Sequence, residues 1–264
     1  GDSVTGFITD GFQVGDDPKV NFGNTNTYRA LCLAAGGAGV SNTDGSITSS
    51  VSAHSSGSFS MAKYTGNNST SGSVGHGLGV TPEMIWVKNS SVSGEWVVYH
   101  KDHTTVDSAF LQLHSTANVS FKGSGFHPWD VSAFSSTTFS LGSNWSAVNA
   151  ANEYMAYCFA SIDGVSKVGT YTGNGSSQTI SGLGFTPRFV MIKGRNFTSN
   201  WIIFDDALVS SGGDNWLYAN LSVYDRTYYG ALSDNFDFTS DGFTLNDAGA
   251  DYNASISYLY LAFA

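Results

Sequence analysis

The histidines stand closest together at one place in the chain, and a close histidine pair could bind a metal. His100 and His103 are the only close pair among the six histidines. Imidazole nitrogens at this spacing could supply half of a zinc site, but no cysteine or third histidine is spaced to complete the set of ligands. The pattern therefore does not predict a zinc site.

Three pairs of aspartates offer a calcium site as an alternative. They lie in or near expected turns, where carboxylate and carbonyl oxygens can gather around a cation. No segment around them matches a known calcium-binding loop, so we expect no cofactor, with calcium as the open alternative. The pairs are Asp16 with Asp17, Asp205 with Asp206, and Asp247 with Asp251.

Patterns of catalytic residues are missing from the sequence. It has no Gly-x-Ser-x-Gly motif, no phosphate-binding loop and no glutamate pair suited to glycoside hydrolysis. Gly75, Gly77 and Gly79 alternate as in a nucleotide-binding fingerprint, but they enter an expected strand rather than a helix, so no helix N-terminus would face a phosphate. We therefore expect a protein that is not an enzyme and has no catalytic residue.

Aromatic side chains are the remaining candidates for a binding surface. Several lie in loop-like stretches near aspartate and asparagine, where an exposed ring could stack on a sugar or anchor a neighbouring protein. We expect part of this set to form a ligand-binding or interface surface. The candidates are Trp129, Trp145, Trp216, Tyr224, Tyr228 and Tyr229.

The composition indicates the kind of scaffold that positions these residues. The 264 residues include 31 glycines, and aromatic residues (14%) outnumber charged ones (12%), which is typical of short strands joined by tight turns. A net charge of −10 argues against nucleic acid, which is bound by lysine and arginine clusters. The longest apolar runs fall far short of the ~20 residues of a membrane helix, so we expect no membrane insertion.

An internal repeat organises the chain. Tyr-Thr-Gly-Asn at residues 64–67 recurs at residues 171–174. A Thr-Pro pair lies further along in each case, at residues 81–82 and 186–187. Lys88 and Trp96 recur as Lys193 and Trp201, each 105 positions later (193 − 88 and 201 − 96). We therefore expect residues 58–160 and 165–264 to be two copies of one fold, with the two tryptophans in its core.

Within each copy, short strand signals alternate with turn signals. About seven strands in a unit of this length predict an all-β fold, with tandem jelly-roll or immunoglobulin-like β-sandwiches of about 105 residues each. In the first copy the expected strands lie near residues 59–64, 73–78, 84–88, 95–100, 109–114, 137–141 and 153–160.

The first 37 residues match only the end of a copy. Residues 7–12 match residues 238–243, and residues 28–34 match the closing segments 154–160 and 258–264. We expect residues 1–37 to be the C-terminal fragment of a preceding unit and the Ser- and Gly-rich residues 38–57 to be a linker. The N-terminal glycine favours a processed or longer precursor.

Such a fragment would leave an apolar face uncovered, which folded proteins avoid. We therefore expect inter-chain packing, or packing by a preceding segment, to shield five side chains with residues from outside the two full copies. These are Phe7, Phe12, Tyr28, Leu31 and Leu33.

The two cysteines occupy the same position in the closing segments of different copies. Equivalent positions in separate units lie far apart, whereas a disulfide needs Cα atoms within about 7 Å. Cys32 and Cys158 are therefore expected to be free and buried.

Several of these motifs together resemble a known family. They are the Tyr-Thr-Gly-Asn-Gly turn, the Gly-Phe-Thr-Pro entry to an apolar strand ending in lysine, the Asn-Trp strand and the closing Tyr-Leu-Ala-Phe-Ala. The chain resembles an uncharacterised tandem β-sandwich repeat domain of marine phage virion proteins, chiefly tail, fibre and other structural proteins. The resemblance covers nearly the whole chain, including residues 36–48, and implies no site residue.

Three functions remain open at this point. The resemblance implies a phage virion structural protein, an appendage or capsid-decorating component at the extracellular virion surface, whose units mediate assembly and adhesion. Its expected partners are other virion proteins, copies of itself in a homo-oligomer, and host surface glycans. The alternative is a receptor- or glycan-binding module with a defined saccharide site. The third is a polysaccharide-degrading enzyme, which would need two carboxylates about 5 to 9.5 Å apart.

Overall fold

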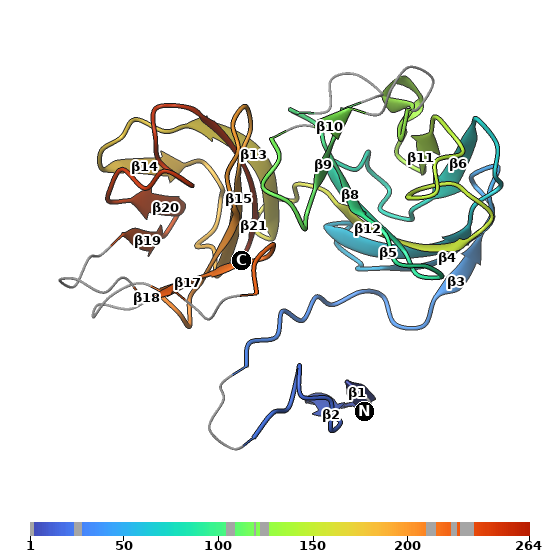
Figure 1. Ribbon diagram of the computed structural model, residues 1–264, viewed down its shortest axis with the longest axis horizontal. Coiled ribbons are helices and arrows are strands. Elements are labelled where there is room, and N and C mark those ends of the chain that lie inside the picture. The colour runs from blue at the N-terminus through green and yellow to red at the C-terminus, as the bar shows by residue number, and fades with distance from the viewer. Residues whose placement is uncertain are drawn as a thin grey trace. The chain divides into compact units, whose positions relative to one another are not determined.

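The computed structural model of the chain is built of antiparallel β-sheets, which confirms the prediction of an all-β fold (Figure 1). The structure describes residues 3–23, 28–103, 109–118, 120–121, 127–209, 215–222, 226–227 and 235–264. The chain divides into two compact units, Gly1–Leu33 and Ala34–Ala264. In the described part, no helix has the length and apolar character needed to cross a membrane.

The first β-sandwich of the larger unit consists of a large and a small sheet. Its elements are β3 (Val40–Asn42), β4 (Ser49–Ala53), β5 (Phe59–Thr65), β6 (Gly72–Gly75), β7 (Met84–Asn89), β8 (Trp96–His100), β9 (Ala109–Gln112), β10 (Ser120–Phe121), the 3₁₀ helix η1 (Val131–Ala133), β11 (Thr138–Leu141) and β12 (Glu153–Phe159). The large sheet has the order β10-β9-β8-β7-β12-β5-β4-β3, and β11 pairs with β6 in the small one.

The second sandwich repeats this arrangement. Its strands are β13 (Ser166–Thr172), β14 (Gln178–Ser181), β15 (Phe189–Gly194), β16 (Trp201–Asp205), β17 (Asn215–Tyr218), β18 (Arg226–Thr227), β19 (Phe236–Thr239), β20 (Gly242–Leu245) and β21 (Ser257–Phe263). The large sheet has the order β18-β17-β16-β15-β21-β13, and the small one β14-β20-β19. This is the order of β10-β9-β8-β7-β12-β5 in the first sandwich, as a repeated fold requires.

The segment expected to be a linker, residues 38–57, is instead part of the first sandwich. It contains β3 and β4, which extend the large sheet beyond β5. Ile47 and Val51 are buried in the first core. A strand covered on one face needs an apolar residue only at every second position, so a Ser-rich segment with few apolar residues can still form one. The expectation of a linker was wrong for this reason.

An ion pair recurs in the two sandwiches with its charges exchanged. Lys101 Nζ lies 2.6 Å from Glu83 Oε1, and at the equivalent positions Arg188 Nε lies 2.6 Å from Asp206 Oδ2. The backbone agrees, because the amide of the later residue in each pair donates to the carbonyl of the earlier one. The two copies therefore keep the same geometry where their residue types differ.

Each core contains a stacked pair of tyrosines. The Tyr64 and Tyr154 ring centroids lie 5.2 Å apart, and those of Tyr171 and Tyr258 lie 5.1 Å apart. One ring of each pair comes from the first strand of the copy, β5 or β13, which we call the front strand. The other comes from the last strand, β12 or β21, which we call the closing strand. The repeated Tyr of Tyr-Thr-Gly-Asn thus joins the two ends of each copy.

The hydroxyl group of the closing-strand tyrosine fixes the loop that precedes it. Tyr154 Oη accepts a hydrogen bond from the Ala150 amide (2.9 Å) and donates one to the Ser146 carbonyl (2.8 Å). Tyr258 makes the same two bonds, four and eight residues upstream. We call this pair of hydrogen bonds the clasp, and both sandwiches contain it.

The glycine of Tyr-Thr-Gly-Asn lies where the loop before the closing strand approaches most closely. A Cβ atom on Gly66 would overlap the carbonyl oxygen of Ala150, and one on Gly173 would overlap that of Ala254. Both contacts are with backbone atoms, which cannot move aside as a side chain can. The glycine is therefore required by packing in both copies.

We expect Gly173→Ala to lower the free energy of unfolding by about 1–3 kcal/mol, because the added methyl group overpacks this contact. Gly94→Ala is the control, since a Cβ atom there meets nothing within 4 Å, and it should change stability by no more than about 0.5 kcal/mol. Urea denaturation measures both variants. Equal effects would show that the close approach does not constrain the turn.

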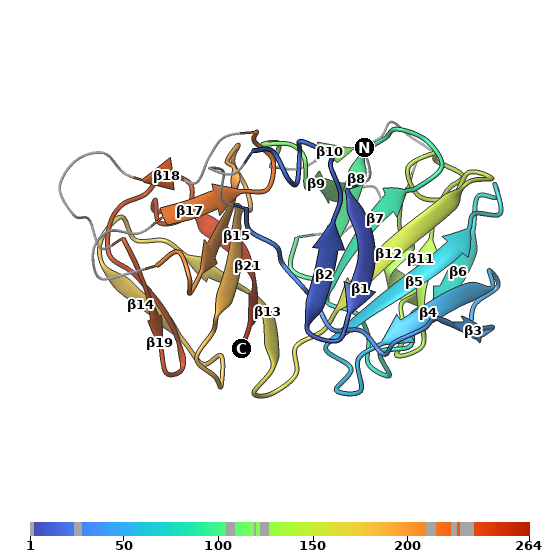
Figure 2. The same ribbon diagram turned by 90° about the horizontal axis from the view of Figure 1, so that it is seen from below.

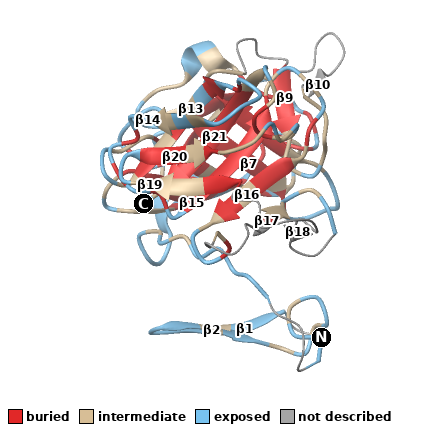
Figure 3. Ribbon diagram, turned by 90° about the vertical axis from the view of Figure 1, so that its left-hand side faces the viewer, coloured by how far each residue is buried: buried red, intermediate tan, exposed pale blue. Residues whose placement is uncertain are grey.

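The N-terminal unit contains a single hairpin. Its strands are β1 (Val4–Ile8) and β2 (Gly11–Val14), which pair with each other in the described part of the chain. Residues 28–34, expected to form a closing strand, have no strand structure. Figure 3 shows that this hairpin is largely exposed, whereas the buried residues concentrate in the sheets of the sandwiches.

Candidate functional site

The tryptophans proposed as exposed binding residues lie inside the sandwiches, which corrects that expectation. Trp129 is fully buried, with its ring centroid 6.0 Å from that of Tyr99. The ring centroids of Trp145 and Phe110 lie 5.0 Å apart, and Trp216 belongs to the second core. The loops that carry these rings fold inward, so the rings fill the cores and cannot stack on a sugar. Outside the described residues lie the other three candidates, Tyr224, Tyr228 and Tyr229.

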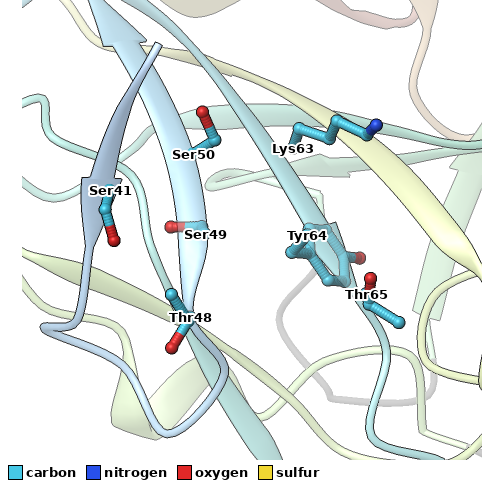
Figure 4. Close-up of a pocket in the computed structure, with 7 residues that line it drawn as sticks. All are labelled: Ser41, Thr48, Ser49, Ser50, Lys63, Tyr64 and Thr65. Atoms are coloured by element: carbon cyan, nitrogen blue, oxygen red, sulfur yellow. The ribbon is translucent and has the colours of Figure 1, made fainter.

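A hydroxyl-lined hollow of about 320 Å³ lies over β3, β4 and β5 (Figure 4). Five of its seven lining residues are serine or threonine, and they come from three neighbouring strands and the turn before β4. Sequence reasoning missed it because this segment read as a linker, although its run of serines and threonines was a visible signal. The lining residues are Ser41, Thr48, Ser49, Ser50, Lys63, Tyr64 and Thr65.

The hollow presents polar groups rather than an aromatic surface. The Tyr64 ring is buried, and its hydroxyl group donates to the Val148 carbonyl at 2.7 Å. At the rim, Lys63 Nζ lies 2.9 Å from Glu153 Oε1, and both side chains are half-exposed. An exposed ion pair of this kind adds little stability, so both groups remain accessible to a polar ligand.

The second candidate surface is the contact between the outer faces of the two large sheets, which we call the joint. In Figures 1 and 2 these sheets lie toward each other, and the small sheets lie at opposite ends. The rings of Phe159 and Phe263, which occupy equivalent positions, contact each other at 6.0 Å. Several apolar residues are buried although they belong to neither core: Met84, Trp86, Val98, Leu111, Phe189, Met191, Leu259 and Leu261.

Lys193 is fully buried in the joint with all three of its donors engaged. Its Nζ donates to the carbonyl of Thr116 (2.9 Å) in the loop after β9, and to the carbonyl (2.7 Å) and hydroxyl group (3.3 Å) of Ser199. Burial lowers the pKa of Lys193 to about 8, against the opposing effect of the Asp251 carboxylate. The ammonium group is therefore still protonated at pH 7 and ties the first sandwich to the second.

The repeated Lys and Trp positions serve different purposes in the two copies. Trp201 is buried in the joint, where its Nε1 donates to the Gln112 carbonyl at 3.0 Å. Trp96 is only half-buried, with Lys88 Nζ 5.8 Å from the centre of its ring. Neither belongs to a sandwich core, contrary to the expectation from the repeat.

The close histidine pair lies beside the joint. The buried Nδ1 of His100 accepts a hydrogen bond from the Asp102 amide at 3.2 Å. Burial lowers the pKa of His100 to about 3 and that of His103 to about 4, and Arg195 of the second sandwich acts in the same direction on both. Both imidazoles are therefore neutral at pH 7. Among the residues that the structure describes, no three or more His, Cys, Asp or Glu gather to hold a metal ion.

Three of the aspartates considered for calcium make contacts with neighbouring residues. Asp17 accepts a hydrogen bond from the Lys19 amide at 2.9 Å, and Asp206 pairs with Arg188. Asp251 accepts two hydrogen bonds from the asparagine that precedes β16. These carboxylates thus fix turns and strand ends.

The five side chains expected to be shielded are uncovered to different degrees. Phe7, Tyr28 and Leu31 are 87%, 43% and 50% exposed, and Phe12 and Leu33 are partly buried. That a partner shields them therefore stays a prediction.

Only one of the two cysteines lies where it was expected. Both are free, and Cys158 is buried in the closing strand of the first sandwich. Cys32 is exposed, because residues 28–34 have no neighbouring strands to cover them. The expectation that Cys32 is buried was wrong for this reason.

The whole chain, residues 1–264, matches one family model, described as Domain of unknown function (DUF7483). The chain belongs to this family. The DUF7483 match includes the N-terminal hairpin as well as both sandwiches, so the hairpin is part of what relates its members. No match was found among curated proteins or among solved structures.

Proposed function

We propose that this chain is a structural protein of a phage virion, an appendage or outer-surface component whose sandwiches mediate assembly and surface adhesion. The observation that carries the proposal is the joint, in which two copies of one repeat bury the apolar outer faces of their large sheets. Interfaces between permanently associated units have such apolar centres. The phage context rests on the resemblance of the repeat motifs to marine phage virion domains. The role requires no catalysis.

The test is whether the chain assembles and where it lies. We expect the purified chain to sediment as a homo-oligomer, and antibodies against it to label the outer surface of the phage particles whose genome encodes it. The labelling is read by electron microscopy, with particles of an unrelated phage as the control. A chain that stays monomeric and labels no particle would overturn the proposal.

A second candidate is recognition of a host surface saccharide at the hydroxyl-lined hollow. The gathering of four exposed serine and threonine side chains, Ser41, Thr48, Ser50 and Thr65, beside the exposed Lys63–Glu153 pair favours it, because polar groups that converge in a concave site orient a ligand. In an NMR titration of the isotope-labelled chain, oligosaccharides should shift the resonances of Ser41, Ser50 and Lys63. Lys63→Ala should weaken these shifts and Lys167→Ala should not. Unchanged resonances around the hollow would exclude this candidate.

A further inference from the structure

The N-terminal hairpin corresponds to the β19–β20 hairpin of the second sandwich. Phe7 lies opposite Phe12 in the β1–β2 pair, as Phe238 lies opposite Phe243 in the β19–β20 pair of the second sandwich. Next to the turn, Ile8 lies opposite Gly11, as Thr239 lies opposite Gly242. Sequence match and strand register therefore agree that the N-terminal unit contains the same element.

Tyr28 also makes two hydrogen bonds with described residues of the segment that precedes it. Tyr28 Oη accepts a hydrogen bond from the Phe22 amide (2.7 Å) and donates one to the Pro18 carbonyl (3.3 Å). Tyr154 and Tyr258 make the same kinds of bond, one accepted from an amide and one donated to a carbonyl, but with residues four and eight positions upstream, whereas the partners of Tyr28 lie six and ten positions upstream. Tyr28 thus takes the position of a closing-strand tyrosine.

The described residues of the N-terminal unit include no counterpart of the front half of the sandwich. In the second sandwich β21 lies between β13 and β15, and β20 pairs with β14, so front strands flank the closing strand on both sides and the hairpin on one. Without them, core positions are uncovered. Val14 is 40% exposed, whereas the equivalent Leu245 is 0% exposed. Tyr28 is 43% exposed and its equivalent Tyr258 0%, and Cys32 is exposed whereas its equivalent Ala262 is 0% exposed.

The turn of the hairpin carries an aspartate that corresponds to one in the second sandwich. In the second sandwich the Asp241 carboxylate accepts hydrogen bonds from the amides of Gly182 (3.0 Å) and Gly184 (2.8 Å), in the loop after β14. These bonds lower the pKa of Asp241. Asp10 occupies the equivalent place between β1 and β2, so a front half would present two amides to it.

We propose that the N-terminal unit is a binding surface for a polypeptide that carries the front strands of a sandwich of this same family, equivalent to β13 through β16. The partner adds strands on both sides of residues 28–34, stacks a tyrosine on Tyr28 and donates two amides to Asp10. Strand addition of this kind derives its affinity from main-chain hydrogen bonds and its specificity from alternate side chains. The inference names a partner for the proposed assembly role and rests on that role.

The test uses the full chain and, as a probe, a polypeptide with the sequence of its own residues 165–209, which spans β13 to β16. The exposed Cys32 reports binding through its rate of reaction with a thiol reagent. We expect the probe to slow this rate at least about tenfold and to protect the amides of residues 28–34 from hydrogen exchange. The buried Cys158 should react no differently with or without the probe.

Variants of the full chain show whether the contact is the proposed one. Tyr28→Ala should abolish the protection and Asp10→Asn should reduce it. Asp16→Asn, at an exposed aspartate in the same unit, is the matched control and should leave the protection intact. Protection that survives Tyr28→Ala would overturn the proposal.

Because the probe alone could fail to fold, a second format joins residues 165–209 to residue 1 of the full chain through a flexible Gly/Ser linker. Protection of Cys32 in this fusion supports the proposal, and an unprotected Cys32 in both formats overturns it. Protection in the chain alone that grows with dimer formation would show that an intact second copy, whose own front strands are already paired with β20 and β21, covers the unit, and would also overturn the proposal. Because none of these readouts involves a phage particle, they can fail while the proposed function stands.

Discussion

Replacing Trp201 with alanine is expected to lower the free energy of unfolding by about 3–5 kcal/mol, the usual cost of removing a fully buried tryptophan. The indole is 1% exposed and fills the joint between the sandwiches. Its loss leaves a cavity between two rigid sheets, which cannot collapse as a loop can. It also removes the hydrogen bond that the Gln112 carbonyl accepts from Nε1, which adds to the cost.

The repeat supplies the control for this experiment. Trp96 occupies the equivalent position in the first sandwich but is only half-buried, so Trp96→Ala should cost no more than about 1–2 kcal/mol. Urea denaturation of both variants, followed by circular dichroism, measures the difference. Equal costs at the two positions would mean that the joint contributes no more than an open sheet surface.

Lowering the pH from 7 to 5 is expected to destabilise the chain by about 2 kcal/mol for each of His100 and His103. Their pKa values in the folded chain, about 3 and about 4, lie below the ordinary value of 6.5. The unfolded chain therefore binds protons first as the pH falls. The stability is fully present above about pH 6.5 and is lost progressively toward pH 3–4. Protonation would also place new positive charge near Arg195, Lys101 and Lys193.

His100→Asn isolates this effect. The asparagine oxygen can replace Nδ1 as acceptor for the Asp102 amide, but the side chain does not titrate. Urea midpoints at pH 7 and pH 5 should therefore differ less in this variant than in the unaltered chain, by about half of the histidine contribution. His127→Asn, at an exposed histidine, should leave the difference unchanged. A variant as acid-sensitive as the parent would contradict the assignment to His100.

Much of the fold could be predicted from the sequence because strand signals and repeat signals are local or pairwise. The expected strands at residues 59–64 and 84–88 correspond to β5 and β7, and the matching Tyr-Thr-Gly-Asn segments mark the same turn in both copies. The chemistry of that turn, a glycine facing a backbone carbonyl, explains why the motif repeats.

The candidate site was harder to predict, because it depends on which faces are covered. Residue types at Trp129 and Trp145 cannot reveal whether their loops fold inward, and divergence between copies arises from packing as readily as from binding. Trp96 and Trp201 occupy the same position in the repeat, yet only Trp201 is covered by the neighbouring sandwich. Burial that depends on long-range packing leaves no local pattern.

The exchanged ion pairs have a consequence for folding. Neighbouring repeats of similar sequence can exchange strands and misfold. A strand exchanged between these copies would bring Glu83 next to Asp206, or Arg188 next to Lys101, so each attraction would become a repulsion. The charges thus disfavour an exchange of these strands between the two sandwiches.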